Sequence, residues 1–250
     1  MPLPPQRPLI QMTASRAPAV AMQVCAWLGG ALFVTALGVY VRFFLALATP
    51  GDGGVPPGTA IAWNLVLFTV FAAHHSLLAR AGAKAWLARV VPAALERTLY
   101  VWVASTLLIG VCLLWQRVPG LIYQLPAAAA WVGWATQALG VVFTVGGARV
   151  LDALDLAGIR QALGATSAPA SAIRVVWPFT VVRHPIYLGW ALIVFGAPTM
   201  TLDRLVWATV STAYLVIAIP WEERSLSAAA GPAYLAYQQR VRWRMVPGVY

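Results

Sequence analysis

The feature that most constrains this chain is its series of long apolar runs. The first run extends from Val24 to Leu47 and contains one charged residue, Arg42, near its far end. A helix needs about 20 apolar residues to cross a bilayer, and an arginine near the end of such a helix snorkels toward water or faces the other helices. The run is too long for the apolar region of a signal peptide. We therefore predict that it is a transmembrane helix.

The composition indicates that most of the chain is built from such helices. Apolar residues make up 61% of the sequence and charged residues only 10%, whereas roughly a quarter of the residues in a soluble domain are charged. We predict an all-α, polytopic integral membrane protein with about six transmembrane helices. The predicted spans cover residues 24–47, 59–78, 99–115, 127–145, 186–200 and 205–221.

The last two predicted spans are short, and only residues 201–204 separate them. They are expected to form a tight helical hairpin that tilts little or locally thins the bilayer, and a re-entrant hairpin is the alternative. Upstream of it, apolar residues recur at helical intervals from Leu151 to Leu163, which predicts a short helix lying in the membrane interface. The proline-rich residues 1–18 are predicted to be a disordered tail, and residues 19–250 to be one integral membrane domain.

Basic residues predict the orientation of the chain in the membrane. The tail, the second and fourth loops and the C-terminal segment carry most of them, and the opposite loops carry only Arg117 and Arg204. By the positive-inside rule both termini are expected in the cytoplasm, and the expected location is the inner membrane of a bacterium. This topology, with anionic lipid as a partner, accounts for the net charge of +10, so no nucleic-acid partner is expected. Cys25 and Cys112 both lie inside apolar runs, which predicts neither a disulfide nor a metal site.

Three polar blocks lie in the C-terminal part of the chain, at residues 183–189, 220–224 and 231–240. The first places Arg183 and His184 directly before Pro185, a residue suited to the first turn of a helix. The free backbone N–H groups of such a helix start, beside these two side chains, are expected to bind an anion. If the last two spans form a hairpin, the three blocks return to one face of the membrane. We expect a cofactor pocket on that face.

These blocks resemble those of a known superfamily of membrane enzymes. The superfamily is that of the isoprenylcysteine carboxyl methyltransferases and phospholipid methyltransferases, and the resemblance rests on Arg183-His184-Pro185-x-Tyr187-x-Gly189, Glu222-Glu223 and Gly231-x-x-Tyr234-x-x-Tyr237. Upstream, residues 75–80, 91–100 and 155–161 are similar to blocks of the bacterial methanethiol S-methyltransferases and of the NnrU-like membrane proteins. The resemblance extends over about residues 60 to 247. One departure is the run 177–180, Trp-Pro-Phe-Thr, which stands where much of the superfamily has a Gly-Pro-Tyr-Arg-like run.

The resemblance implies a methyltransferase that uses S-adenosylmethionine and no metal. It implies that Arg183 or Arg240 pairs with the methionine carboxylate, and that one carboxylate of a glutamate pair accepts hydrogen bonds from the ribose hydroxyls or the amino group. The tyrosines would surround adenine with apolar walls and edge hydrogen bonds. The arginine missing from the run 177–180 leaves open which cation meets the cofactor carboxylate. The full set implied for cofactor binding is Arg183, His184, Tyr187, Gly189, Glu222, Glu223, Tyr234, Tyr237 and Arg240.

The methyl acceptor requires residues of its own. A thiol with a pKa of about 8.5 or higher needs a base or a cationic environment before it attacks. His75, near the cytoplasmic end of the second span, and His184 are the candidate bases, because histidine titrates near neutral pH. On the predicted interfacial helix, Asp155, Arg160 and Gln161 are expected to bind the substrate together with His75.

Three functions are compatible with these residues. The first is methyl transfer to a small thiol, which would convert methanethiol into dimethyl sulfide, and the upstream blocks favour it. The second is methylation of a lipid-borne acceptor, either a prenylcysteine carboxylate or an amine head group. The third is a NnrU-like protein linked to nitrogen-oxide metabolism, against which the retained glutamate pair argues. Each block also has a plain structural explanation, since basic, acidic and tyrosine residues are common at the ends of membrane helices.

Overall fold

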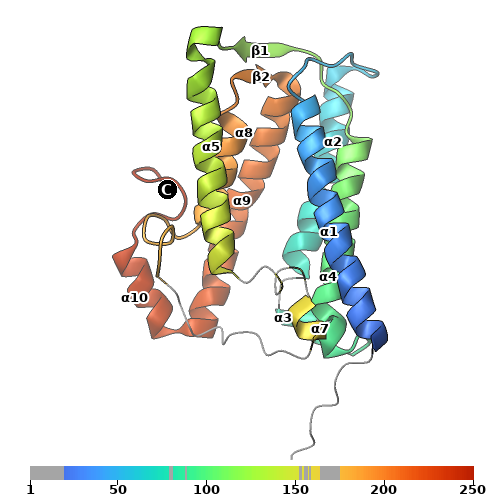
Figure 1. Ribbon diagram of the computed structural model, residues 1–250, viewed down its shortest axis with the longest axis vertical. Coiled ribbons are helices and arrows are strands. Elements are labelled where there is room, and N and C mark those ends of the chain that lie inside the picture. Colours follow the sequence, from blue (N-terminus) through green and yellow to red (C-terminus); the bar gives the residue numbers. More distant parts are fainter. Residues whose placement is uncertain are drawn as a thin grey trace, which may run out of the picture.

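The computed structural model describes residues 20–78, 81–87, 89–151, 154, 157, 159–163 and 175–250. This part of the chain is almost entirely helical, which confirms the predicted all-α class (Figure 1). The predicted disordered tail lies outside the described residues.

Five of the described helices are long and apolar enough to cross a bilayer. Three of them begin directly after a proline, at Pro56, Pro92 and Pro126, where the fixed φ suits a helix start and the missing N–H costs no helical hydrogen bond. The chain is therefore a multi-pass membrane protein, as predicted. The five helices are α1 (Val20–Ala46), α2 (Pro57–Leu77), α4 (Ala93–Leu114), α5 (Ala127–Val150) and α9 (Leu202–Ala230).

The remaining described elements are short. Two strands, β1 (Leu121–Gln124) and β2 (Thr199–Thr201), form an antiparallel pair that the sequence did not predict. α7 is the described helical part of the predicted interfacial helix. The short helices are α3 (Ala81–Leu87), α7 (Ile159–Ala162), α8 (Pro185–Phe195) and α10 (Pro232–Arg240).

The prediction of a fifth span over residues 186–200 is wrong in its length. α8 has 11 residues, which is about 16 Å of helix, whereas the hydrocarbon core of a bilayer is about 30 Å thick. Gly196 and Pro198 follow the helix, and neither residue favours its continuation. The chain then passes through β2 into α9. α8 alone therefore covers only about half of the bilayer.

The predicted sixth span over residues 205–221 lies inside a longer helix, α9, which is long and apolar enough to cross a bilayer. α9 has 29 residues and continues to Ala230. Gly231, whose φ of 53° is in the region that glycine favours, ends the helix. Glu222 and Glu223 therefore project from within a helix, and their directions are set by its geometry.

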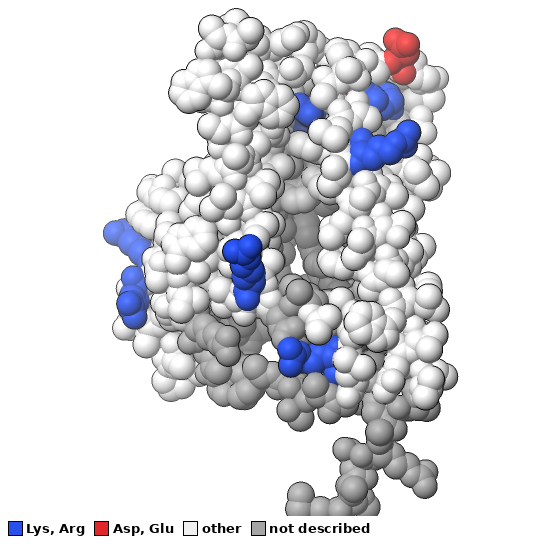
Figure 2. All heavy atoms as spheres, in the orientation of Figure 1, with Lys and Arg blue, Asp and Glu red and all other residues white. Residues whose placement is uncertain are grey.

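The helices form two groups (Figure 1). α5, α8 and α9 lie together with α10 at one end, and α1, α2 and α4 lie together with α3 and α7 at that same end. α5 packs along α8, α1 packs along α4, and α2 contacts α9 as well as α4, which joins the two groups. In the space-filling view the surface between the groups is hollowed, and the visible face carries few charged side chains (Figure 2). Such a surface suits contact with lipid.

An aromatic core connects the two groups. Trp207 of α9 is 1% exposed. It packs edge-on against Phe43 of α1, Phe68 of α2 and Trp115, the residue that directly follows α4. The ring centroids lie 5.1, 5.6 and 5.4 Å from that of Trp207. Close packing of this kind, rather than exclusion of water, holds membrane helices together.

A stripe of buried glycines on α5 lets α8 approach closely. Gly133, Gly140 and Gly147 recur at intervals of seven residues, which is about two helical turns. A Cβ atom on Gly140 would lie 2.6 Å from the carbonyl oxygen of Gly189 and 2.9 Å from the backbone nitrogen of Ile193. Small residues are typical of such contacts between membrane helices. The contact fixes the position of α8, whose first residues belong to the site described below.

The end of the molecule that carries the strands is held by a buried carboxylate. Asp203 accepts hydrogen bonds from Trp115 Nε1 (3.1 Å), the Val118 N–H (2.8 Å) and Arg117 Nε (2.5 Å). Arg204 is also buried and donates to two backbone carbonyl oxygens. The two arginines of the predicted extracytoplasmic loops therefore have partners inside the protein.

Candidate active site

A cluster of charged side chains surrounds Glu223 of α9. This residue is 4% exposed, and its carboxylate accepts hydrogen bonds from Arg183 Nε (2.7 Å) and Arg244 Nε (3.0 Å). His184 Nε2 and Gln238 Nε2 lie 3.4 and 3.5 Å from its oxygens. A buried charge is costly unless it is paired and hydrogen-bonded. Here two guanidinium groups meet that requirement, and Glu223 is the centre of the cluster.

Arg183 forms hydrogen bonds with several groups. Besides bonding Glu223, its Nη1 donates to two carbonyl oxygens of the segment 241–250, both at 2.8 Å, and its side chain is 8% exposed. The backbone N–H groups of Arg183 and His184 donate to carbonyl oxygens of the same segment, at 2.9 and 2.7 Å. The C-terminal segment thus occupies the two N–H groups directly before α8, and an anion site at the start of this helix stays a prediction.

Glu222 faces a different set of side chains. Its Oε2 accepts a hydrogen bond from the Tyr187 hydroxyl (2.8 Å) and lies 3.6 Å from His184 Nδ1. The rings of His184 and Tyr187 stack with their centroids 5.3 Å apart. Because Nε2 of His184 faces Glu223, this imidazole bridges the two carboxylates. The Glu222 side chain remains 44% exposed.

The third predicted block meets this cluster through α10. Tyr234 and Tyr237 are buried with ring centroids 5.9 Å apart, and the Tyr237 hydroxyl donates to the carbonyl oxygen of Phe179 (2.8 Å). Burial raises the pKa of Tyr237 to about 12 and also raises the pKa of Tyr234. Both hydroxyls therefore stay protonated at neutral pH and act as donors and packing groups. The structure thus brings the three predicted blocks together.

Two residues predicted to bind the cofactor are placed differently from the rest. Arg240 is exposed at the end of α10, and its side chain forms no hydrogen bond or ion pair with another described residue. Gly189 is buried in the contact between α8 and α5, where Gly140 and Thr144 leave no room for a Cβ atom. The position of Gly189 indicates a packing role.

A pocket of about 340 Å³ opens beside Glu223. It offers two guanidinium groups, a carboxylate, an amide and a hydroxyl. Such a set can bind a ligand that carries a carboxylate together with hydroxyl or amino groups. The lining residues come from α9, α10 and the C-terminal segment: Pro220, Glu223, Arg224, Ser227, Gln238 and Arg244.

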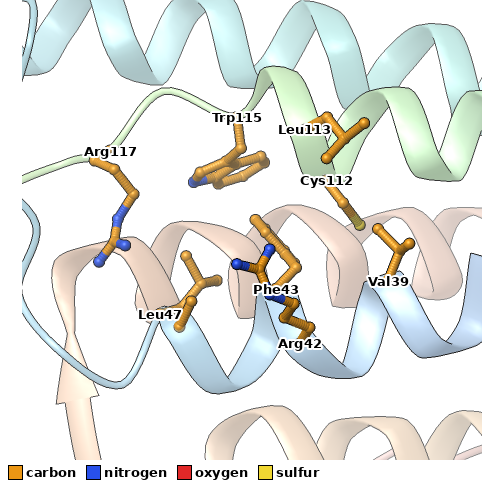
Figure 3. A pocket seen from close by; sticks show the side chains of 9 residues that line it. Val39, Arg42, Phe43, Leu47, Cys112, Leu113, Trp115 and Arg117 are labelled. Atoms are coloured by element: carbon orange, nitrogen blue, oxygen red, sulfur yellow. The ribbon is translucent and has the colours of Figure 1, made fainter.

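A second cavity, of about 220 Å³, lies between α1 and the end of α4 (Figure 3). Arg42 and Arg117 border it, and apolar side chains such as Leu113 form much of its wall. Arg42 is exposed there, near the far end of the first span, where the sequence placed it. None of the predicted site residues lines this cavity, whereas Glu223 lines the pocket described above.

The other predicted base, His75, lies in the last turn of α2. The Tyr100 hydroxyl of α4 lies 2.7 Å from its Nδ1 and 3.3 Å from its Nε2. The next residue, Ser76, has its Oγ 3.0 Å from the hydroxyl of Tyr214 on α9. Residues of α2, α4 and α9 thus meet around His75 and Ser76.

The predicted interfacial helix is described only in part. α7 carries Arg160 and packs against α1 and α4, with Ile159 beside Gly30. Asp155 and the side chain of Gln161 lie outside the described residues. A substrate-binding role for these residues stays a prediction.

Comparison with known proteins identifies the family. Over 214 residues the chain is 34% identical to methanethiol S-methyltransferase 2 of Bradyrhizobium diazoefficiens, and the match covers 80% of this chain and 83% of that protein. It is also 34% identical over 225 residues to the methanethiol S-methyltransferase of Mycobacterium tuberculosis, covering 84% and 89%. The chain belongs to the methanethiol S-methyltransferase family.

The chain is also similar to an animal protein that has a different name, nurim. Over 179 residues the chain is 30% identical to nurim of Sus scrofa, and the match covers 66% of this chain and 68% of nurim. No family model matches the sequence. No solved structure matches it. The predicted resemblance to membrane methyltransferases is nevertheless confirmed by the relatives named above.

Membership of the methanethiol S-methyltransferase family makes the chain an enzyme, and its reaction requires a methyl donor. Within the described ranges, no group of three or more His, Cys, Asp or Glu side chains is arranged to hold a metal ion. A family member of this kind needs one place for the donor and one for the acceptor. The pocket beside Glu223 and the surroundings of His75 are the two candidates.

Two residues of the Glu223 cluster, Arg244 and Gln238, were not predicted. The available signal for Arg244 was the alternation of arginines at positions 240, 242 and 244. The segment 241–250 contains neither helix nor strand, so no periodicity indicates which of these side chains points inward. Gln238 lies one turn of α10 after Tyr234 and thus on the same face of the helix. That spacing is the signal that would have found it.

Proposed function

We propose that this protein transfers a methyl group from S-adenosylmethionine to methanethiol and produces dimethyl sulfide. The observation that carries the proposal is the similarity, over most of the chain, to several proteins named methanethiol S-methyltransferase. The meeting of the three predicted blocks beside one charged pocket supports it. Residues 19–250 would form the single domain that carries this activity.

The residues that line the pocket suit S-adenosylmethionine. This cofactor carries a carboxylate and an ammonium group at one end, and hydroxyls and an amino group at the other. Arg224 and Arg244 offer guanidinium groups to the carboxylate, and Ser227 and Gln238 offer hydrogen bonds to the other polar groups. We assign the carboxylate to Arg244, because its side chain remains 36% exposed while it is bonded to Glu223.

Arg183 and Glu223 then act as positioning residues. The donors of Arg183 are bonded within the protein and its side chain is 8% exposed, so it holds the C-terminal segment in place. Glu223 holds Arg244 and Gln238 at the edge of the pocket. The sequence instead implied that Arg183 or Arg240 meets the carboxylate. The proposal gives this role to Arg244 instead.

The reaction also requires that the acceptor lose a proton. S-Adenosylmethionine supplies an electrophilic methyl group, so the protein has to align the acceptor sulfur, exclude water and remove the thiol proton. Both ring nitrogens of His184 face carboxylates, at 3.4 and 3.6 Å. His75 faces the neutral hydroxyl of Tyr100 and remains exposed. We therefore assign proton removal to His75 and the bridging of the glutamates to His184.

The proposed location is the inner membrane of a bacterium, with both termini in the cytoplasm. A charged cofactor does not cross lipid, so its pocket has to open on the side where the cofactor is available. Arg149, Arg224 and Arg240 lie at or near the α10 end of the molecule, whereas Arg117 and Arg204 at the opposite end are bound inside the protein. This distribution supports a cytoplasmic α10 end.

Neighbouring glutamates provide a matched test of the donor site. Glu223→Gln removes the partner of Arg244 and should weaken S-adenosylmethionine binding about tenfold or more, that is by about 1.4 kcal/mol. Glu222→Gln removes the same charge one position away, outside the pocket lining, and should change the affinity much less. Isothermal titration calorimetry of the protein in detergent measures both, and headspace gas chromatography measures dimethyl sulfide.

The outcomes test the donor site and the identity of the acceptor separately. Dimethyl sulfide from the wild type, with weakened cofactor binding in Glu223→Gln alone, supports the proposal. Equal cofactor affinity in the wild type and in Glu223→Gln would remove the pocket from the donor site. Tight cofactor binding without dimethyl sulfide would contradict methanethiol as the acceptor and favour a lipid-borne one.

A further inference from the structure

His75 is surrounded by aromatic rings from three helices. Phe71 of α2 stacks on it with ring centroids 5.7 Å apart, Tyr100 of α4 lies at 5.5 Å, and Tyr214 of α9 meets it edge-on at 6.5 Å. The His75 side chain is nevertheless exposed, in contrast with Trp207 of the aromatic core, which is 1% exposed. His75 is therefore accessible at the surface while these rings lie around it. We call Phe71, His75, Tyr100 and Tyr214 the aromatic enclosure.

Tyr214 joins the aromatic enclosure to the rest of the site. Its hydroxyl lies 3.0 Å from Ser76 Oγ on α2, and its ring packs edge-on against Phe68, with centroids 6.0 Å apart. Along α9, Tyr214 lies about two turns before Glu222. Glu222 in turn accepts the hydrogen bond of Tyr187. The aromatic enclosure thus lies beside α9, the helix that also contributes Glu223 to the pocket lining.

Polar side chains inside membrane helices are costly and are usually functional. The aromatic enclosure contains an imidazole and two phenols in the spans of an otherwise apolar bundle. Its rings suit a small thiol, because sulfur is polarisable and makes favourable contacts with aromatic edges. Arg97, whose guanidinium lies 5.0 Å from the centroid of Tyr100, adds a cation nearby, and a cation favours the thiolate.

We propose that the aromatic enclosure is the binding site of the thiol acceptor, and that Tyr214 limits the length of the alkyl chain that the site accepts. This inference rests on the proposed methyl transfer and extends it to the acceptor class, which is short alkanethiols. Unlike Tyr100, Tyr214 makes no hydrogen bond to a nitrogen of His75; its hydroxyl is bonded to Ser76. It can therefore act as a wall without acting on the base.

The step at this site is balanced. The thiol S–H bond breaks and its proton passes to the imidazole of His75. The acceptor sulfur uses the freed electron pair to form a bond to the methyl carbon, while the bond from that carbon to the sulfonium sulfur breaks and leaves its electron pair on that sulfur. The acceptor becomes an uncharged thioether, which can leave through the bilayer. His75 then returns the proton to water.

Substitution of Tyr214 tests the inference. Tyr214→Leu shortens the wall, and Tyr214→Phe keeps the ring while losing the bond to Ser76. Tyr40→Leu makes the same change in the aromatic core, where Tyr40 stacks on Trp190 at 5.4 Å, and serves as the matched control. The measured quantity is kcat/KM for methanethiol, ethanethiol and 1-propanethiol with S-adenosylmethionine. Cofactor affinity by calorimetry provides the second readout.

The wild type should prefer methanethiol. In Tyr214→Leu the ratio of kcat/KM for 1-propanethiol to that for methanethiol should rise about tenfold or more, since one methylene in a fitted pocket changes selectivity by about 10–200-fold. Tyr214→Phe and Tyr40→Leu should keep the wild-type ratio. All variants should keep the wild-type affinity for S-adenosylmethionine. Tyr214→Val, which also removes the ring and shortens the wall, should shift the ratio in the same direction and stands in if Tyr214→Leu does not fold.

The contradicting results are distinct. An active wild type with an unchanged ratio in Tyr214→Leu, or in Tyr214→Val where the former is unfolded, would overturn the acceptor site alone. An equal shift in Tyr40→Leu would show a general loss of packing and would overturn it too. A wild type that binds S-adenosylmethionine but forms no thioether from any of the three thiols would overturn both this inference and the proposed function.

Discussion

At the scale of single residues, the two adjacent glutamates of α9 face different surroundings. Successive residues of a helix point about 100° apart, since there are 3.6 residues per turn. Glu223 accordingly meets Arg183 and Arg244, and Glu222 meets Tyr187. One carboxylate thus orders the pocket, and the other faces the acceptor side. A pair of acidic residues in a flexible loop would not hold these two directions apart.

Tyr237 provides a test at alkaline pH. Its pKa of about 12 in the folded protein exceeds the usual value of about 10, so folding favours the protonated phenol. This stabilisation is complete below about pH 10 and is lost as the pH rises toward about 12. The melting temperature of Tyr237→Phe in detergent should therefore fall less over this range than that of the wild type. At neutral pH the variant should lose about 1 kcal/mol with the bond to Phe179.

The wild type and the variant are compared in the same detergent and at the same ionic strength. A variant whose melting temperature falls as steeply as that of the wild type between these pH values would show that Tyr237 is not the buried phenol responsible.

At the scale of elements, the position of α8 depends on its contact with the glycine stripe of α5. α8 is too short to span the bilayer, so its position depends on close packing against α5. Gly189 and Gly140 allow the two backbones to approach. Arg183 and His184 directly precede α8. The contact with α5 therefore also positions these two residues of the candidate site.

Substitution of Gly140 tests this dependence. The Cβ atom of Gly140→Ala would meet backbone atoms of α8, among them the carbonyl oxygen of Gly189 at 2.6 Å, which cannot turn aside as a side chain could. Overpacking of this kind should cost about 1–3 kcal/mol of stability, and it should also weaken S-adenosylmethionine binding. Gly110→Ala in α4 is the matched control, because its Cβ atom would meet nothing within 4 Å. Equal melting temperatures and affinities for the two variants would contradict the role of the stripe.

The apolar runs predicted the long helices well, but they could not predict the lengths of α8 and α9. Residues 196–200 are mostly apolar, yet the helix ends before them because Gly196 and Pro198 do not favour it. α9 continues past Trp221 because residues that leave the membrane can still form helical hydrogen bonds, which hydropathy does not register. The pairing of β1 with β2 joins segments far apart in sequence.

Like the fold, the candidate site could be predicted only in part. Its three blocks were found by their polarity and resemblance, whereas Arg244 was not found, because its contact with Glu223 depends on an irregular segment.

At the scale of the whole molecule, two groups of helices meet through α2, α9 and the aromatic core. The proposed donor pocket lies in the group that contains α9 and α10, and the aromatic enclosure lies where α2 and α4 meet α9. Under the proposal, a charged donor would come from water and a membrane-soluble acceptor from lipid. α10, α3 and α7 lie at the same end of the molecule (Figure 1).

Labelling of single cysteines tests the proposed orientation. In a background without Cys25 and Cys112, Gly54→Cys places a thiol in the exposed loop between α1 and α2, and Ala233→Cys places one on the exposed face of α10. A maleimide that does not cross membranes should label the first in intact cells and the second only after the inner membrane is opened. The reverse pattern would place the cofactor pocket on the wrong side of the membrane.

Transfer of an isotopically labelled methyl group tests the central claim most directly. Purified protein in detergent receives methanethiol and S-adenosylmethionine whose sulfonium methyl carries deuterium, and mass spectrometry of the headspace follows dimethyl sulfide. The account predicts dimethyl sulfide with one labelled and one unlabelled methyl group, formed much more slowly by Glu223→Gln. Dimethyl sulfide without label, or none at all from a protein that binds the cofactor, would contradict it.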